Sequence, residues 1–277
     1  MQSNCYQALY RLADVRLEWA EHLLSSELIR LRRADPQRDG YGLSWTWGEE
    51  HLEFLPEKAL WRPEGRELLI ADLHLGKAEV FQAHGIPLPS DGDRGTFNPL
   101  LDLCSRVQPK TLIILGDLVH GPLGLTDTLR ETLEALPELT GCPITLVGGN
   151  HDRHCRTLGL PQQPSYRLGQ LWLSHEPEHA LEPSSDCSSQ QARLLNVCGH
   201  IHPVASFGFG GDRLRLPCFA YDSREERLLI PAFGELTGGH ECGQVYRKWL
   251  VAEGTIVPWQ NPEFRARKKR LVRCCLL

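Results

Sequence analysis

The sequence has few of the features that membrane, secreted or structural-zinc proteins need. No stretch approaches the ~20 consecutive apolar residues of a transmembrane helix, and no basic segment followed by an apolar one opens the chain. The ten cysteines include no C-x-x-C pair, and they are too few in 277 residues for a disulfide-rich scaffold. We therefore expect reduced cysteines, a cytoplasmic location and no association with a membrane.

The chain also lacks a net positive charge, since 30 Lys and Arg stand against 35 Asp and Glu. This balance gives no overall case for a surface that binds polyanions. The charge is unevenly distributed, because residues 264–277 carry basic side chains and no acidic one. The sequence thus predicts an acidic body followed by a basic tail.

Length and periodicity divide the chain into three parts. A hydrophobic content of 41% in 277 residues can bury a substantial core. Residues 6–31 place leucine and alanine at helical spacing, and charged residues with Pro36 and Gly40 then interrupt this pattern. We predict an amphipathic or disordered extension at 1–42, one folded domain at 43–255 and a basic tail at 256–277.

Short apolar runs alternate with helical patterns from residue 50 onward. Runs that are apolar at nearly every position are typical of strands buried on both faces, and they occur at 68–70, 111–115, 144–147 and 171–173. Helical spacing predicts helices at 77–84, 97–108 and 126–136, with Gly85 as the C-terminal cap of the first. The alternation indicates an α/β fold. After residue 195 the runs at 214–220 and 227–232 favour a second, antiparallel sheet packed on the first.

Polar side chains directly follow four of the predicted strands and a further short apolar run at 197–198. They are Asp72 and His74, then Asp117, then Asn150 and His151, then His175, and finally His200 and His202. Ligands bind at the carboxyl ends of strands in open α/β sheets, so these side chains can converge. One residue separates the members of each Asp-x-His and His-x-His pair. We expect both members of a pair to point the same way from an extended segment.

The convergent residues offer only oxygen and nitrogen ligands to a metal. The candidate ligands are Asp72, His74, Asp117, Asn150, His175, His200 and His202. A closed zinc site is satisfied by four ligands, so a larger set that includes a carboxylate able to bridge predicts two ions. The absence of thiolates argues against a purely structural zinc. Mixed carboxylate and imidazole ligands suit Mn²⁺, Fe²⁺ or Zn²⁺.

Two neighbouring divalent ions favour hydrolysis of phosphoesters. Such a pair acidifies a bridging water, so that a hydroxide between the ions attacks phosphorus, and it stabilises the attacking and leaving oxygens. His151 follows a candidate ligand without having to bind metal itself. It is therefore our candidate catalytic residue, which would stabilise or protonate the departing oxygen. The alternative is that His151 is only a structural neighbour.

The order of these motifs resembles the calcineurin-like binuclear metallophosphoesterase superfamily over about residues 50–240. The resemblance implies a two-sheet sandwich flanked by helices, with layers in the order α/β/β/α. It also implies a division of the ligands. Asp72, His74 and His202 would hold one ion, Asn150, His175 and His200 would hold the other, and Asp117 would bridge them.

Segments 71–77, 85–89, 115–120 and 231–239 are similar to a narrower bacterial group, the DNA ligase-associated metallophosphoesterases. That resemblance implies manganese-dependent endonuclease or phosphodiesterase activity on single-stranded DNA. It also implies a role in DNA repair alongside a DNA ligase, a helicase-like protein and an exonuclease. The extension at 1–42 and the basic tail depart from the family pattern.

Contacts with a nucleic acid are less sharply indicated. Lys77, Arg94 and Arg153 lie near the predicted mouth of the site, where they either contact DNA phosphates or are only solvated. Phe81 and Phe207 either stack on bases or belong to the core.

Two other functions stay open at this point. One is a phosphodiesterase or phosphatase that acts on nucleotides or other small phosphoesters, and the other is a non-catalytic scaffold with the same fold. The terminal Cys274-Cys275-Leu276-Leu277 also fits a prenylation motif, but we favour an unmodified tail that is disordered or touches nucleic acid.

Overall fold

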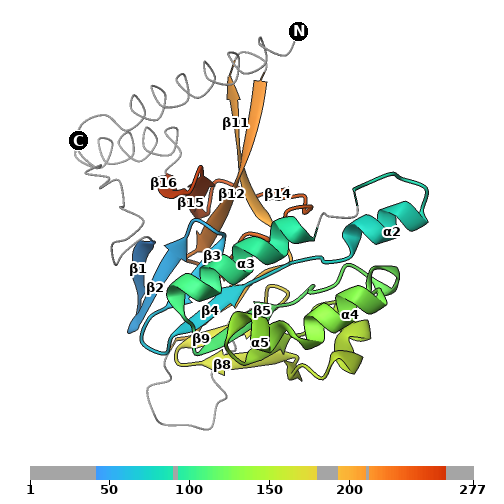
Figure 1. Cartoon of the computed structure of the whole chain (residues 1–277). Helices are drawn as coiled ribbons and strands as arrows, with labels where there is room; N and C mark the ends of the chain where they lie inside the picture. The colour runs from blue at the N-terminus through green and yellow to red at the C-terminus, as the bar shows by residue number, and fades with distance from the viewer. Residues whose placement is uncertain (1–41, 90–92, 180–192, 210–211, 260–277) are drawn as a thin grey trace, which may run out of the picture. The chain divides into compact units, whose positions relative to one another are not determined.

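The computed structural model describes residues 42–89, 93–179, 193–209 and 212–259, and in these residues two β-sheets pack face to face (Figure 1). Residues 1–41 of the predicted extension and residues 260–277 of the predicted basic tail, with Cys274, lie outside the described residues. The first sheet has seven strands in these residues, ordered β1 to β7. They are β1 (Leu43–Trp47), β2 (Glu50–Leu55), β3 (Ala59–Arg62), β4 (Glu67–Ile70), β5 (Thr111–Leu115), β6 (Ile144–Val147) and β7 (Gln162–Gln163).

The centre of the first sheet is parallel and buried on both faces. Strands β4, β5, β6 and β7 pair in parallel, whereas β1 to β4 form an antiparallel meander. Along β4, Leu68 and Ile70 face one apolar cluster and Leu69 faces another, because side chains alternate across a strand. This explains why β4, β5 and β6 are apolar at nearly every position.

Helices cover the outer face of the first sheet (Figure 1). They are α3 (Arg94–Val107), α4 (Asp127–Glu134) and α5 (Leu136–Thr140), with the 3-10 helix η2 (Asp152–Leu158). Helix α2 (Lys77–Ala83) instead lies to the side of the sheet and contacts the 3-10 helix η1 (Pro122–Gly124). Leu100 and Leu103 of α3 and Leu129 and Leu133 of α4 are buried against this sheet. A helical layer over the second sheet is not seen among the described residues.

The second sheet has nine strands in the described residues, and it is mixed rather than antiparallel. The order is β14-β11-β12-β13-β10-β9-β8, and β15 joins β12 to β16. The strands are β8 (Ser165–Leu168), β9 (Leu171–Ser174), β10 (Leu195–Cys198), β11 (Pro203–Phe209), β12 (Asp212–Asp222), β13 (Arg227–Leu229), β14 (His240–Glu241), β15 (Arg247–Ala252) and β16 (Thr255–Trp259).

The parallel part of this sheet corrects the sequence-based prediction. β10 pairs in parallel with both β9 and β13. The run at 171–173 therefore belongs to the second sheet, where its apolar residues face those of the first sheet. Periodicity reports that a strand is buried, but it carries no information on which sheet supplies its neighbours. The two-sheet α/β architecture itself is confirmed.

Several boundaries also differ from the prediction. α3 begins at Arg94 rather than residue 97, and the predicted helix at 126–136 is two helices. Pro137 lies in the first turn of α5, where its missing N–H costs nothing and a new helix can begin. β16 runs to Trp259, four residues beyond the predicted domain end at 255, because a proline is tolerated in this edge strand.

Among the described residues, no helix is long and apolar enough to cross a membrane.

Candidate metal centre

The predicted ligands lie together where strands of both sheets end. Asp72 and His74 follow β4, Asp117 follows β5 and Asn150 follows β6. From the second sheet, His175 follows β9, and His200 and His202 lie between β10 and β11. The centre is therefore built from the edges of two sheets, and it needs their packing to exist.

Six of the seven residues form two groups, each with ligand atoms within 4.8 Å of one another. In the first group, His202 Nε2 lies 3.3 Å from His74 Nε2 and 3.4 Å from Asp72 Oδ1. In the second group, His175 Nε2 lies 3.1 Å from His200 Nδ1 and 3.5 Å from Asp117 Oδ1. Two ligands each about 2.1 Å from a tetrahedral ion lie about 3.4 Å apart, so this spacing suits a shared cation.

Asp117 and Asn150 extend these groups. The Oδ1 atom of Asp117 faces the second group, while its Oδ2 atom lies 3.7 Å from His74 Nε2 in the first. Each carboxylate oxygen therefore faces a different group. Asn150 Oδ1 lies 3.0 Å from His175 Nε2, which adds it to the second group.

Hydrogen bonds on the far side of the rings indicate which nitrogens are free to bind a metal. His175 Nδ1 lies 3.1 Å from the Leu115 carbonyl and His202 Nδ1 lies 3.1 Å from the Gly238 carbonyl. A carbonyl only accepts, so each Nδ1 carries the proton and each Nε2 offers a lone pair to the centre. His175 Nε2 then faces another acceptor, the amide oxygen of Asn150, at 3.0 Å. A cation between such atoms removes their repulsion, so these residues fit a metal.

Burial keeps His74 neutral, as a metal ligand must be. Desolvation, reinforced by neighbouring imidazoles and Lys77, lowers the pKa of His74 to about 2. A neutral imidazole retains the lone pair that binds a cation.

The backbone of the centre is left-handed rather than extended. Positive φ angles occur at Asp72 (55°), His74 (48°), Asp117 (50°), His200 (63°) and His202 (49°). The expectation that the Asp-x-His and His-x-His pairs lie in extended segments is therefore wrong. Asp and His tolerate this region better than most side chains, but each such residue costs roughly 1–3 kcal/mol. Such strain is typical of functional sites.

Close approach explains two of the glycines. Gly116 has a φ of 77°, and a Cβ there would lie 2.1 Å from His175 Nδ1. A Cβ on Gly149 would lie 2.4 Å from Asp117 Oδ1. Both positions leave no room for a side chain beside a predicted ligand.

His151 lies beside the two groups without belonging to either. Its backbone N–H donates to Asp117 Oδ1 at 3.1 Å, and its ring centroid lies 5.7 Å from that of His74. The ring also stacks on His120, with centroids 5.5 Å apart and planes 13° apart. This position suits the role predicted for His151, a group that faces the substrate rather than a metal.

His120 is a residue whose place in the site sequence reasoning did not identify. Its Nδ1 lies 3.2 Å from His74 Nδ1, and its ring lies parallel to Phe81 with centroids 6.4 Å apart. The signal was its position three residues after Asp117, in the loop that follows β5. Phe81 thus lies beside the centre, whereas Phe207 packs against Trp259 in a separate apolar cluster.

Asp152 was also missed as a contributor to the site. Its carboxylate is fully buried and accepts the backbone N–H groups of Leu118 and Gly149, both at 2.8 Å. It therefore ties the loop after β5 to the loop after β6. Burial raises its pKa, while these hydrogen bonds act in the opposite direction.

The predicted substrate-binding residues lie at different distances from the centre. Lys77 begins α2, and its Nζ lies 6.0 Å from the ring centroid of Phe81. Burial lowers the pKa of Lys77. Arg94 and Arg153 line two separate grooves, which are described below.

Residues 66–229 match the calcineurin-like phosphoesterase family. The chain belongs to this family. The predicted superfamily is confirmed, and members of the family are hydrolases that bind two divalent metals. Comparison with curated proteins finds no match.

Solved structures add a nuclease to these similarities. The nuclease MPE of Pseudomonas putida is 27% identical with a TM-score of 0.60, over 79% of this chain and 100% of that one. A protein of unknown function from Aquifex aeolicus is 18% identical with a TM-score of 0.31, over 52% of this chain and 81% of that one. A Vps29 variant from Entamoeba histolytica is 15% identical with a TM-score of 0.30, over 69% and 94%.

Proposed function

We propose that this calcineurin-like phosphoesterase is a manganese-dependent endonuclease that hydrolyses phosphodiester bonds of single-stranded DNA in DNA repair. The similarity to the Pseudomonas putida nuclease supports a nucleic acid as the substrate class, and the resemblance to the DNA ligase-associated group supports DNA. The resemblance to the DNA ligase-associated group supports manganese, the repair context and partners that include a DNA ligase, a helicase-like protein and an exonuclease. The cytoplasm, where thiols stay reduced, suits the six free cysteines buried among the described residues.

The observation that carries the proposal is the position of Asp117 between two groups of ligands. One of its oxygens lies 3.5 Å from His175 and the other 3.7 Å from His74. We assign Asp72, His74 and His202 to one divalent ion, Asn150, His175 and His200 to the other, and Asp117 to both. Ions held there supply Lewis acidity at a phosphate, by lowering the pKa of a water and stabilising oxygens that gain negative charge.

The remaining residues of the site act on the substrate or on the ligands. The exposed edge of the His151 imidazole can protonate the oxygen that leaves phosphorus. Leu115 and Gly238 hold His175 and His202 in the tautomers that keep Nε2 free, through their carbonyl groups. Lys77 adds positive charge near His74, which favours the approach of an anionic phosphate.

The test is cleavage of an end-labelled single-stranded DNA and of a small chromogenic phosphodiester, with Mn²⁺, Mg²⁺, Zn²⁺ or no metal. We expect cuts in the DNA that require Mn²⁺ and that Asp117→Ala abolishes. Hydrolysis of the small diester alone would move the assignment to small phosphoesters. Metal binding without turnover of either substrate would show that the protein is a non-catalytic scaffold.

A further inference from the structure

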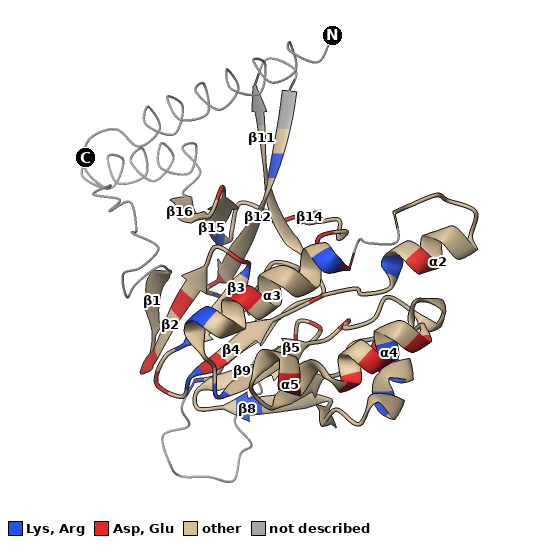
Figure 2. Cartoon of the chain, viewed as in Figure 1, with Lys and Arg blue, Asp and Glu red and all other residues tan. Residues whose placement is uncertain are grey.

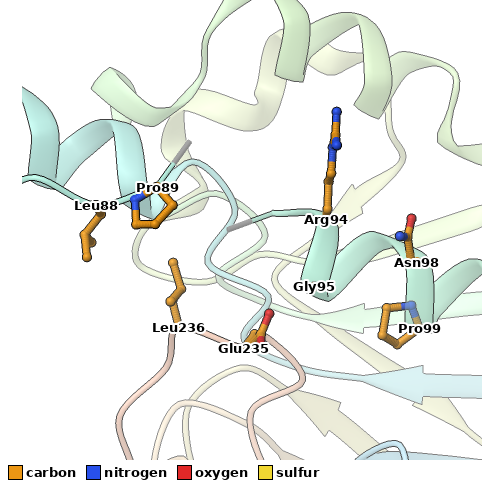
Figure 3. A pocket seen from close by; sticks show the side chains of 8 residues that line it. All are labelled: Leu88, Pro89, Arg94, Gly95, Asn98, Pro99, Glu235 and Leu236. Atoms are coloured by element: carbon orange, nitrogen blue, oxygen red, sulfur yellow. The ribbon is translucent and has the colours of Figure 1, made fainter. Parts of the chain in front are cut away.

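Two grooves adjoin the metal centre. The first, here the α3 groove, has a volume of about 430 Å³ and is lined by Leu88, Pro89, Arg94, Gly95, Asn98, Pro99, Glu235 and Leu236 (Figure 3). The second, here the η2 groove, has a volume of about 860 Å³ and includes Arg153, Arg156, Gln162 and Gln163. Asn150 and His175 of the second ligand group also line the η2 groove, so this groove opens directly onto the centre.

Hydrogen bonds connect the segments that form the α3 groove to the loops that carry the first ligand group. Asp93, at the start of α3, accepts the backbone N–H of Gly76 at 2.9 Å, two residues after His74. The loop that carries Leu236 donates from Gly234 N–H to the Asp72 carbonyl, and its Gly238 carbonyl accepts from His202. This groove therefore borders the ligands that follow β4 and precede β11.

Strand order puts the centre between the two grooves. In the first sheet the order β4-β5-β6-β7 leads from Asp72 through Asp117 and Asn150 to Gln162 of the η2 groove. In the second sheet, β14 comes in sequence after the loop that carries Glu235 and Leu236 of the α3 groove, and β8 comes directly after Pro164 of the η2 groove. β14 and β8 are the first and last strands in the order β14-β11-β12-β13-β10-β9-β8. The second sheet thus gives the order α3 groove, metal centre, η2 groove, and the first sheet agrees in placing the η2 groove on the β7 side of the ligands.

The arginines of the two grooves have no partner among the residues that the structure describes. Among arginines whose side chains the structure describes, four guanidinium groups make no hydrogen bond, ion pair or ring contact, and they are Arg94, Arg153, Arg156 and Arg224. Three of these four line the grooves, and both η2 arginines are exposed. In Figure 3, the side chain of Arg94 extends away from Glu235. Other arginines are held by acids, as Arg62 is by Glu50 and Glu67.

Free guanidinium groups are unusual in the described part of the chain, where Lys and Arg are interspersed with Asp and Glu (Figure 2). In the η2 groove, Glu176 and Glu178 come from the end of β9 and the arginines come from η2. The glutamates repel a phosphate backbone, and the arginines attract it. The amides of Gln162 and Gln163 add neutral donors of the kind that bind phosphate and sugar oxygens.

We propose that the two grooves bind the nucleotides on either side of the scissile phosphate, with Arg153 and Arg156 holding phosphates on one flank and Arg94 on the other. The inference rests on the proposed function and adds the path of the strand and Arg156 as a substrate contact. Because both flanks are held, cleavage falls inside a strand rather than at its end. A groove that tracks the backbone with arginines is sequence-tolerant.

The test measures binding of a fluorescein-labelled, phosphorothioate single strand by anisotropy, with Mn²⁺ and at several salt concentrations. The phosphorothioate backbone slows cleavage, so binding is seen alone. Each phosphate contact contributes about 0.7 to the slope of log affinity against log salt for single strands. We expect the double variant R153A/R156A to lower this slope by about 1.4, and R94A to lower it by about 0.7.

Lys110→Ala is the matched control. Lys110 is exposed at the amino end of β5, opposite to the edge that carries the centre, so its loss removes one positive charge away from the grooves. Its affinity and salt slope should equal those of the wild type. A loss of affinity and salt slope in Lys110→Ala as large as that in R94A would show that the grooves contribute only non-specific charge. An unchanged slope in R153A/R156A, or a wild type that does not bind the strand, would equally overturn the proposal.

Cleavage of an unmodified, end-labelled strand separates this inference from the proposed function. We expect Mn²⁺-dependent cuts that avoid the terminal nucleotides at both ends, because a terminal phosphate fills only one groove. DNA that is cut freely at either terminus would overturn the two-groove path while the nuclease assignment stands. Arginine-dependent binding without any cleavage would leave the grooves in place and refute the nuclease.

Discussion

Asp117 is the residue on which both halves of the metal centre depend. Its two carboxylate oxygens face different ligand groups, and His151 donates its backbone N–H to one of them. The side chain comes from the loop after β5, between the ligands that follow β4 and β6.

Asp117→Ala should abolish phosphodiester hydrolysis and release bound manganese, since both groups lose a negatively charged ligand. Turnover of the small diester and the metal content of the purified protein check this. Asp127→Ala, which removes an acid from the first turn of α4, is the control and should keep both the turnover and the metal content of the wild type. Full activity in Asp117→Ala would refute the assignment.

His151→Ala should separate metal binding from rate. The ring lies outside both ligand groups, so the variant should bind as much manganese as the wild type. Its DNA cleavage rate should fall by about 10²- to 10⁴-fold, the range for loss of a general acid. Comparing single-turnover cleavage with metal content tests this. A variant that loses metal in parallel with rate would make His151 a ligand or a structural residue.

Asp152→Ala should lower stability, because it leaves the backbone N–H groups of Leu118 and Gly149 buried without an acceptor. We expect a loss of about 2 kcal/mol or more in the free energy of unfolding, and a fall in Tm of about 4–8 °C. Thermal melts of Asp152→Ala and Glu134→Ala make the comparison, since Glu134 is exposed on α4. Equal melting temperatures would show that the buried carboxylate does not connect the two loops.

At the scale of elements, the loops that follow the strands hold the ligands in a conformation most side chains avoid. Five predicted ligands have a positive φ angle, and so does Gly116, which precedes Asp117. The strands supply the compensating stability, because their apolar residues are buried on both faces. Rigid strand ends therefore allow short, strained loops to place ligands from five segments at one edge.

Gly116→Ala should damage the centre more than its backbone strain alone explains. A Cβ at this position would lie 2.1 Å from His175 Nδ1, whereas at Gly141, which also has positive φ, it would meet nothing within 4 Å. Gly141→Ala should cost about 1–2 kcal/mol of stability and keep full activity. Gly116→Ala should lose activity as His175 is displaced. Similar activity in the two variants would show that His175 does not need its present position.

In the whole molecule, the residues that would hold the metals come from both sheets. His74 and Asp117 follow strands of the first sheet, and His175 and His202 belong to loops of the second. A cation that binds these residues can bind only when the sheets are packed, so binding stabilises the folded state.

Removing metal with EDTA should therefore lower Tm, and added Mn²⁺ should restore it. At 100 times the dissociation constant, binding contributes about 2.7 kcal/mol, which corresponds to about 5–10 °C for a chain of this size. Thermal melts across a Mn²⁺ titration measure the effect. Asp117→Ala should show little shift under the same titration, and an equal shift in that variant would place the stabilising ion elsewhere.

Much of the fold was predictable because buried strands have a distinct composition. The runs at 68–70, 111–115, 144–147 and 171–173 all lie in strands. Strands that are half-exposed, such as β1 with its alternating burial, were missed because their pattern is weaker. The division of strands between two sheets depends on pairing across distant residues, which no local pattern reports.

The residue types that follow each strand are enough to predict the chemistry of the site, because they define which ligands are available. Tertiary structure decided how these residues meet. Asp72 and His202 are far apart in the chain, yet their ligand atoms lie 3.4 Å apart. Packing of the sheets also placed His120 beside His74 and buried Asp152 between two loops. It put three arginines into the two grooves, where they have no partner among the described residues. The physical reason is that residue type sets affinity for a metal or a phosphate, whereas distance and burial are set by contacts between segments remote in sequence.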